Sequence, residues 1–395
     1  MKRLKRNIKN FRQNFRDTDK LLLFMMLLML FSGLLNIVSA SSREAFSLNV
    51  SIYHYFFRHG MMIIIGLIGF LTIINFETKN YKLPAILGYI VIAGLLIYLL
   101  FTGDGYRGSK NWLTIAGIKF QPSEFAKPIL IVSVSLLFEK FYRKIRTKNN
   151  NRFYYILSII LVGVVFPIIV FIQKDLGTSI IMLGILLALF LSGPILRHDK
   201  VKFVLGGVGV VTIVGLTLLI SGTNPLTEEQ TSRLNFFNPC KRYETSGYQT
   251  CNGIIAINDG GLKGLGVSKS KQKYSYIPEP HTDSVFAIIV EEYGFLISVL
   301  IFICYLIIIY RILKIAENAK TLRNRYIALG VAVYIFMHIF INLGGLFAVI
   351  PLTGVPLPFF SYGGTFTVTL ICSIGIVQRI AIENKNAKIK IGEVL

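Results

Sequence analysis

The sequence is poor in charged residues, in cysteine and in histidine. Only 16% of its 395 residues are charged, and it has 20 acidic residues, four cysteines and five histidines. A soluble domain carries about 25% charged residues, so a soluble protein of this length is excluded. No Cys/His spacing typical of a metal site is present. No nucleic-acid motif accompanies the net charge of +22, which basic loops beside anionic lipid headgroups explain better.

Long apolar runs take the place of these missing residues. Hydrophobic residues make up 53% of the chain and fall in blocks near twenty residues long. Such a block crosses about 30 Å of hydrocarbon at a rise of about 1.5 Å per residue. We therefore predict an all-α polytopic membrane protein with ten spans, near residues 20–40, 58–76, 83–101, 122–138, 153–172, 176–194, 203–220, 284–310, 326–350 and 362–378.

The distribution of Lys and Arg predicts the orientation of these spans. The side that both termini share holds 28 of the 42 Lys and Arg, so both termini are expected to be cytoplasmic. The apolar run after the basic start is too long for a cleaved signal peptide. We expect a basic cytoplasmic tail at 1–19, a transmembrane domain at 20–382 and a second cytoplasmic tail at 383–395.

The connection 221–283 is expected to be a large extracellular loop between the seventh and eighth spans. At about sixty residues it is too long for a passive connector, and loops on a rigid scaffold usually carry function. It contains Cys240 and Cys251, which either form a disulfide in an oxidising environment or stay reduced. In both cases the pair carries no chemistry.

Polar residues at the rim of a bilayer are candidates for function. The first cluster, Lys110 to Lys127, includes Glu124 three residues before Lys127 on a helix that Pro122 can begin, so the two charges can pair. A helix start with one internal salt bridge explains this cluster most simply. The functional alternative is a cationic wall for an anionic headgroup.

In the second cluster Asp175 follows Lys174, and an N-cap of the next helix is the simpler explanation.

The third cluster is His281-Thr282-Asp283, at the mouth of the eighth span. Thr282, Asp283 and the following Ser284 are all good N-cap residues, so a helix start explains them. A carboxylate at the rim of a low-dielectric bundle, beside an imidazole, is also what a general base needs. The residues alone leave both interpretations open. Glu291 and Glu292 lie about 12–14 Å deeper, where we expect them to stabilise the bundle.

Together the clusters resemble the SEDS family (shape, elongation, division and sporulation) of the FtsW/RodA type. Four segments carry the resemblance in the family's order and spacing, over roughly residues 18–382. The PEPHTD form is closer to the FtsW-like branch. Ser284 stands where an aromatic residue is common in the family, and Asn111 replaces a frequent Arg. The segments are Lys110–Lys127 ending in QPSEFAK, KDLGT at 174–178, PEPHTDSVFAIIVEEYGF at 278–295 and PLTGVPLPFFSYGGT at 351–365.

The resemblance implies a peptidoglycan glycosyltransferase of the bacterial plasma membrane, with its active site on the extracellular side. It would join lipid II units into glycan strands in septal or elongation cell-wall synthesis, releasing undecaprenyl diphosphate. The family's essential aspartate maps onto Asp283, as general base. Further positions implicated in cavity structure or substrate contact are Arg58, Lys110, Gln121, Glu124, Lys127, Asp175, His281, Thr282 and Ser361.

The resemblance also implies partners: a class B penicillin-binding protein acting as transpeptidase, and the division or elongation machinery. A divalent cation, Mg²⁺ or Mn²⁺, could bridge the diphosphate, but no ligand cluster marks a place for it. The alternative function is a lipid II flippase without catalysis. Because the motif residues cluster at the outer side, chemistry is favoured over transport. An ion-coupled transporter is disfavoured because the spans contain few charged residues.

Overall fold

The computed structural model describes residues 11–392, apart from 103, 107–108, 116–117, 148–150, 223–225, 245–246, 276 and 279. The chain is mostly helical, as predicted. Its long helices are α2 (Lys20–Ala40), α4 (His54–Ile73), α5 (Lys82–Thr102), α6 (Pro122–Arg146), α7 (Arg152–Ile172), α8 (Leu176–Ser192), α9 (Arg197–Ile220), α13 (Val285–Glu317), α14 (Leu322–Leu346) and α15 (Gly364–Gly392).

Eight of these helices are long and apolar enough to cross a membrane, which makes the chain an integral membrane protein. The other two differ from them in length or charge. Helix α8 is apolar but has only 17 residues, and α6 carries the buried charges Glu124 and Lys127. Each of the ten predicted ranges overlaps one helix. The complete ten-span topology nevertheless remains a prediction, because length and composition select only eight helices.

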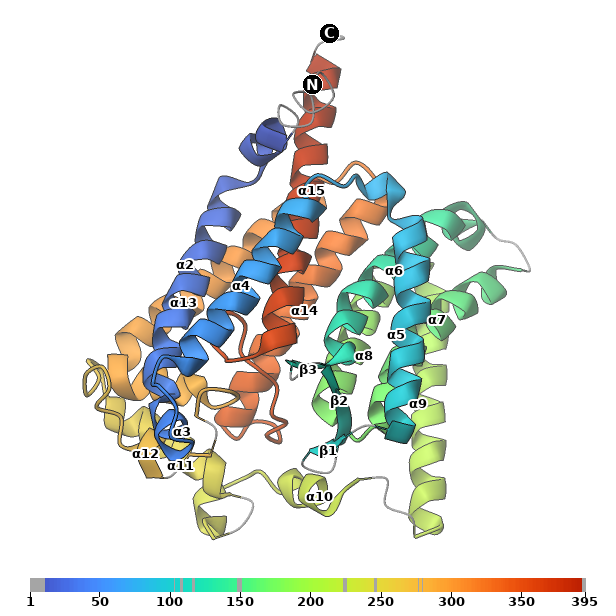
Figure 1. Ribbon diagram of the computed structural model, residues 1–395. Coiled ribbons are helices and arrows are strands. Elements are labelled where there is room, and N and C mark those ends of the chain that lie inside the picture. The colour runs from blue at the N-terminus through green and yellow to red at the C-terminus, as the bar shows by residue number, and fades with distance from the viewer. Residues whose placement is uncertain are drawn as a thin grey trace.

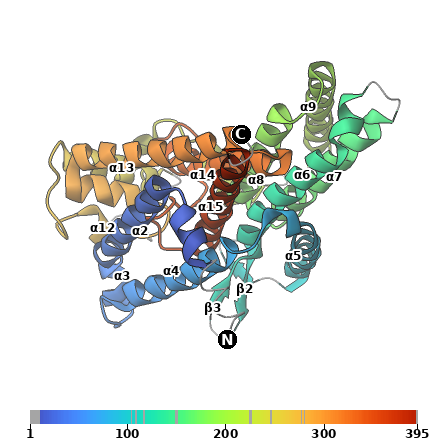
Figure 2. The same cartoon turned by 90° about the horizontal axis from the view of Figure 1, so that it is seen from above.

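Helices α14 and α15 lie at the centre of the bundle (Figures 1 and 2). Helices α2, α4 and α13 pack on one side of them, and α5 to α9 on the other. The close approach of α2 to the α14–α15 connection requires a glycine. A Cβ on Gly33 would lie 2.0 Å from the carbonyl oxygen of Phe359. Helix α9 is peripheral, since none of its described side chains after Asp199 is buried.

The start of α2 and the end of α15 lie at the same end of the bundle, here called the terminal end (Figure 1). Ion pairs connect the segments that meet there. Asp19 caps α2 and pairs with Arg311 of α13, and Lys385 of α15 lies 2.6 Å from Asp17. These contacts join the N-terminal tail to the C-terminal tail and to the start of the loop 311–325, all of which the Lys and Arg count assigned to one side of the membrane.

The opposite end, here called the loop end, holds the connection 221–283 (Figure 1). This connection is structured: it contains α10 (Glu228–Leu234), the 3-10 helix η2 (Pro239–Arg242), α11 (Tyr248–Gly260) and α12 (Gln272–Ser275). The loop end also carries α3 (Ser42–Ser47) and a small antiparallel sheet in the order β1 (Asp104–Tyr106), β2 (Ser109–Ile115), β3 (Ile118–Phe120). The 3-10 helix η1 (Thr78–Asn80) precedes α5.

Helix α13 is interrupted, whereas the sequence predicted one continuous span at 284–310. Gly294 has φ +81° and ψ 173°, which separates a short first part, residues 285–293, from a long second part. We call residues 285–293 the half-helix. A Cβ on Gly294 would lie 2.4 Å from the backbone nitrogen of Gly264, so no other residue fits there. Apolar periodicity is continuous through this break, and it therefore left the interruption undetected.

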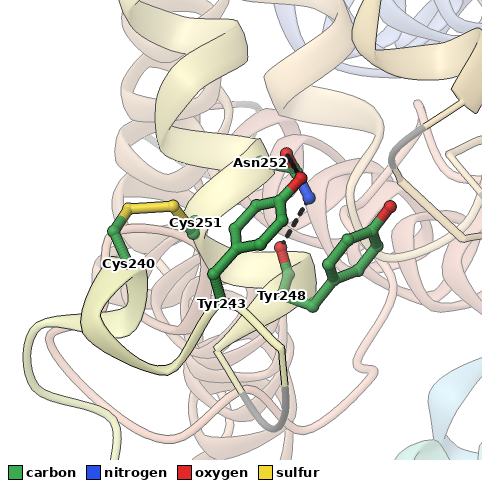
Figure 3. Close-up of a disulfide and its surroundings, with 5 residues drawn as sticks. All are labelled: Cys240, Tyr243, Tyr248, Cys251 and Asn252. Atoms are coloured by element: carbon green, nitrogen blue, oxygen red, sulfur yellow. Dashed lines mark hydrogen bonds between the residues drawn. A yellow bond between two sulfur atoms is a disulfide. The ribbon is translucent and has the colours of Figure 1, made fainter.

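A disulfide between Cys240 and Cys251 closes the segment before α11 (Figure 3). Its Cα atoms are 4.9 Å apart. Beside it the amide of Asn252 donates a hydrogen bond of 2.9 Å to the carbonyl oxygen of Tyr248, and the Tyr243 hydroxyl lies 3.3 Å from the amide oxygen of Asn252. The disulfide therefore connects η2 to the first turn of α11.

Reduction of this disulfide is expected to loosen the start of α11. Closing a loop of this length stabilises by up to roughly 3 kcal/mol, so the thermal midpoint of the detergent-solubilised protein should fall with reductant. A Cys240→Ser/Cys251→Ser variant should show the lower midpoint without reductant and no further change with it. An equal midpoint for the oxidised and reduced wild type would contradict the assigned role.

Candidate active site

The carboxylate of Asp283 is buried at the loop end, directly before the half-helix. Its exposed fraction is 6%. The amide nitrogen of Gln249 on α11 donates to its Oδ1 at 3.2 Å, and the hydroxyl of Thr282 lies 3.3 Å from the same oxygen. Oδ2 faces Gly354, where a Cβ would lie 3.6 Å away. Two neutral side chains, those of Gln249 and Thr282, thus hold one oxygen of this carboxylate.

Asp283 does not cap the helix that follows it. The N-cap position of α13 belongs to Ser284, and its side chain makes no capping hydrogen bond. Gln249 instead donates to the Ser284 hydroxyl at 3.0 Å. A helix therefore begins here, as the helix-start interpretation expected, with Ser284 at the N-cap position. The side chain of Asp283 contacts Gln249 and Thr282 instead of the first turn.

Asn342 of α14 fixes the backbone on both sides of this carboxylate. Its amide nitrogen donates to the carbonyl oxygens of Asp283 and Val355, each at 2.7 Å. The side chain is 2% exposed, so both bonds form away from water. One amide thus ties the half-helix start to the connection between α14 and α15.

Ser361 and Thr282 form a second tie between the same segments. The Ser361 hydroxyl donates to the carbonyl oxygen of Thr282 and accepts a 2.7 Å bond from the backbone nitrogen of Leu357. Both predicted residues therefore lie beside Asp283. Ser361 shapes the backbone there, and Thr282 also contacts the carboxylate itself.

His281 is buried in a group of aromatic rings. Its Nδ1 lies 3.3 Å from the carboxylate of Glu44 on α3, and its ring lies 4.9 Å from that of Tyr55 and 5.5 Å from that of Tyr362. Burial raises the pKa of the Tyr362 hydroxyl; Arg58 lowers that pKa and Glu44 raises it. Arg58 thus acts on this group from the start of α4, and its side chain is exposed.

Asp175 connects the starts of α6 and α8. Its Oδ1 caps α8 by accepting from the backbone nitrogen of Thr178 at 3.1 Å. Its Oδ2 accepts from the amides of Asn111 at 2.8 Å and Gln121 at 3.1 Å. The predicted N-cap is present, and the second oxygen has a separate function in joining two helices and the sheet.

Lys127 and Glu124 form a buried ion pair of 2.7 Å on α6. Lys127 Nζ also lies 3.0 Å from Nε2 of His338 on α14, and His338 Nδ1 lies 3.1 Å from the carbonyl oxygen of Pro356. Because an ammonium group only donates, Nε2 must accept and Nδ1 must carry the proton. Lys127 is 0% exposed, so it stands within the packed core and not on an open wall.

These groups converge because α14 carries His338 and Asn342 one turn apart. His338 binds the carbonyl of Pro356, and Asn342 binds the carbonyl of Val355. Lys127, through His338, and Asp283, through Asn342, are therefore linked to adjacent residues of the connection between α14 and α15. Several buried polar atoms here have no hydrogen-bond partner among the described residues. They are Glu124 Oε2, Ser123 Oγ, Thr353 Oγ1 and Asn342 Oδ1. Such atoms are expected to meet water or a polar ligand.

Sequence reasoning missed the roles of Gln249 and Asn342. Asn342 is assigned no role in the sequence analysis, although an amide inside an apolar span was a usable signal. Gln249 lies in a polar loop where nothing distinguishes it. The side chain of Lys110 falls outside the described part of β2. Within the described residues, no group of three or more His, Cys, Asp or Glu could hold a metal ion.

The fold and this site define a class: a polytopic helical membrane protein that buries a carboxylate at one end of its bundle. The chain belongs to the FtsW, RodA and SpoVE family of cell cycle proteins, whose sequence model matches residues 19–386.

Named relatives agree with this membership over nearly the whole chain. It is 30% identical to stage V sporulation protein E of Bacillus subtilis, covering 92% of this chain and 96% of that one. It is 28% identical to a probable peptidoglycan glycosyltransferase FtsW of Geobacter sp. (strain M18), covering 93% and 98%. These relatives favour the FtsW-like branch.

Solved structures show the same fold at low sequence identity. A chain of a peptidoglycan synthase complex, described as coordinating polymerization and crosslinking, aligns with a TM-score of 0.72 at 21% identity. The alignment covers 92% of this chain and 97% of that chain. Rod shape determining protein RodA of Thermus thermophilus aligns with a TM-score of 0.63, also at 21% identity, covering 92% and 96%.

Replacing Asn342 by Leu is expected to destabilise the protein by about 2–4 kcal/mol, because two buried carbonyl groups lose their donor. Asn384→Leu is the matched control, since buried Asn384 donates to one carbonyl, that of Ile315. Thermal unfolding in detergent should show the larger loss for Asn342→Leu. A loss no greater than that of the control would contradict the double anchoring.

Proposed function

We propose that this chain is a peptidoglycan glycosyltransferase that polymerises lipid II, with Asp283 as its general base. The single observation that carries the catalytic assignment is the buried carboxylate of Asp283. It lies at the loop end, is 6% exposed and is held in place by Gln249 and Thr282. The family, the relatives named as probable peptidoglycan glycosyltransferases and the fold support the reaction class.

In the proposed reaction a sugar hydroxyl of the acceptor attacks the anomeric carbon of the donor. The new glycosidic C–O bond forms while the bond to the lipid diphosphate breaks, with inversion at that carbon. The hydroxyl proton passes to Asp283, and the electron pair leaves with the diphosphate. Gln249 and Thr282 orient the carboxylate, which confines it to the geometry that proton transfer requires.

A diphosphate leaving group needs cations close by in a dry site. Of the two predicted cations whose side chains the structure describes, Arg58 is the better placed, because it is exposed and lies near the aromatic group around His281. Lys127 is buried and already paired with Glu124. We therefore assign headgroup contact to Arg58 and a core-positioning role to Lys127. No step is assigned to a metal ion.

The proposed topology has ten spans, cytoplasmic termini and the loop end outside the cell. The shared position of the termini and the disulfide at the opposite end both support it. Polymerisation alone leaves glycan strands uncrosslinked, so we propose a class B penicillin-binding protein as partner. The similarity to a chain from a complex that coordinates polymerization and crosslinking supports this partner.

Asp283→Asn should abolish polymerisation of labelled lipid II, because the amide is nearly the same size but cannot take up the proton. General base catalysis contributes about 10²–10⁴-fold, so the rate should fall by at least about 100-fold. Glycan products are measured on gels, with purified protein and its transpeptidase partner.

The matched control is Asp17→Asn, which alters a buried aspartate paired with Lys385 at the terminal end. It should retain polymerisation. A folded Asp283→Asn protein with wild-type rates would remove the catalytic assignment. Transbilayer movement of lipid II in liposomes without any polymer would replace the proposed enzyme with a flippase.

A further inference from the structure

Residues 261–275 of the large connection pack against the half-helix, and we call them the docked segment. Its backbone enters the break in α13 at Gly294. The nitrogens of Leu265 and Gly266 donate to the carbonyls of Glu291 and Glu292, at 2.8 and 3.0 Å. Across the break, the nitrogen of Phe295 donates to the carbonyl of Gly261 at 2.9 Å. The docked segment thus supplies the hydrogen bonds that a continuous helix would make itself.

Two carboxylates at the end of the half-helix hold the same segment through side chains. Glu291 accepts from the hydroxyl of Ser270 and from the backbone nitrogen of Lys271 at 2.7 Å. Glu292 accepts from Lys273 Nζ at 2.6 Å and from the hydroxyl of Ser39 on α2 at 2.7 Å. These contacts join the docked segment, the half-helix and α2 at one point.

The ion pair between Lys273 and Glu292 is fully enclosed, with both side chains 0% exposed. Lys273 Nζ also lies 2.7 Å from the Ser39 hydroxyl and 5.0 Å from the ring centre of Tyr274. Its donors are therefore used inside the protein. A side chain in this position has no surface with which to contact a lipid-linked sugar.

The half-helix is held by the large connection at both of its ends. Gln249 of α11 contacts Asp283 and Ser284 at the start of the half-helix, and Lys273 pairs with Glu292 near the end of the half-helix. Helix α11 itself packs along α13. The direction in which the half-helix presents Asp283 consequently depends on whether the docked segment stays in place.

We propose that Lys273 and Glu292 are positioning residues for the transfer reaction, which lock the half-helix so that Asp283 meets the acceptor hydroxyl. The inference rests on the proposed function, because it assigns these residues to the same reaction. Loss of the lock frees the docked segment and leaves a buried carboxylate without its cation. Water can then reach the backbone at Gly294, the half-helix becomes more mobile, and Asp283 loses its fixed orientation.

A positioning role predicts that substitution lowers kcat and leaves KM nearly unchanged. Because Lys273 does not touch substrate, Lys273→Met should lower kcat by about 10- to 100-fold, the cost of a small misplacement of a catalytic group. KM should change by less than about twofold, since ground-state binding is retained. Glu292→Gln should behave in the same way. Lys273→Arg keeps the charge and should recover most of kcat.

The matched control is Arg379→Met at the terminal end. Arg379 is also buried, bonds Glu383 at 3.0 Å and donates to the carbonyl of Ile74 at 3.1 Å, but lies on α15 far along the chain from this lock. It should destabilise the protein while the folded fraction keeps its kcat. An equal drop in kcat for both variants would reduce the lock to general stabilisation and overturn the proposal.

Hydrogen–deuterium exchange on full-length protein gives a readout independent of activity. Lys273→Met should speed exchange in residues 261–275 and 285–293, and Arg379→Met should not. Wild-type kcat in a folded Lys273→Met protein, or unchanged exchange in these two stretches, would refute the lock. If wild type makes no polymer at all, the proposed function fails, and the exchange comparison still decides whether the lock exists.

Discussion

The interior of an apolar bundle penalises every polar group that has no partner, and this constraint organises the whole loop end. An isolated charge there costs far more than one in water. Two ion pairs inside the core, Lys127 with Glu124 and Lys273 with Glu292, reduce this cost. Lys127 and Glu124 share α6, and Lys127 also reaches His338 of α14. Lys273 and Glu292 join the docked segment to the half-helix. Buried charges therefore also bring separate elements together.

Asp283 is another carboxylate buried at this end of the bundle, and hydrogen bonds fix its direction. Its side chain contacts the amide of Gln249 and the hydroxyl of Thr282, while its backbone carbonyl accepts from Asn342. Gln249 belongs to α11 and Asn342 to α14, so the orientation of the carboxylate depends on elements distant in sequence.

The break in α13 connects stability with the site. A continuous helix would satisfy its own backbone and leave the large connection without a place to bind. The interruption at Gly294 opens carbonyls and nitrogens that the docked segment satisfies. The half-helix and the docked segment are thereby joined through their backbones. The disulfide holds the other part of the same connection, close to Gln249.

Much of the fold and part of the site could be predicted from the sequence. The apolar blocks located the helices, since hydrocarbon thickness fixes span length. Asp175, His281, Thr282 and Asp283 were singled out because polar groups are conspicuous in an apolar chain, whereas Ser361 came from the family resemblance alone. The same logic gave the pairing of Glu124 with Lys127, because residues three apart share a helix face.

Only the tertiary structure decided what these groups meet. Gln249, Asn342 and Lys273 act through partners between 13 and 234 residues away, and local spacing carries no information about such contacts. The break at Gly294 was equally hidden, because a glycine followed by apolar residues is compatible with an unbroken helix. Sequence by itself thus determined which segments are apolar enough to cross a membrane and which polar residues are costly there. Packing determined how that cost is offset, because a buried polar group finds its partner through space.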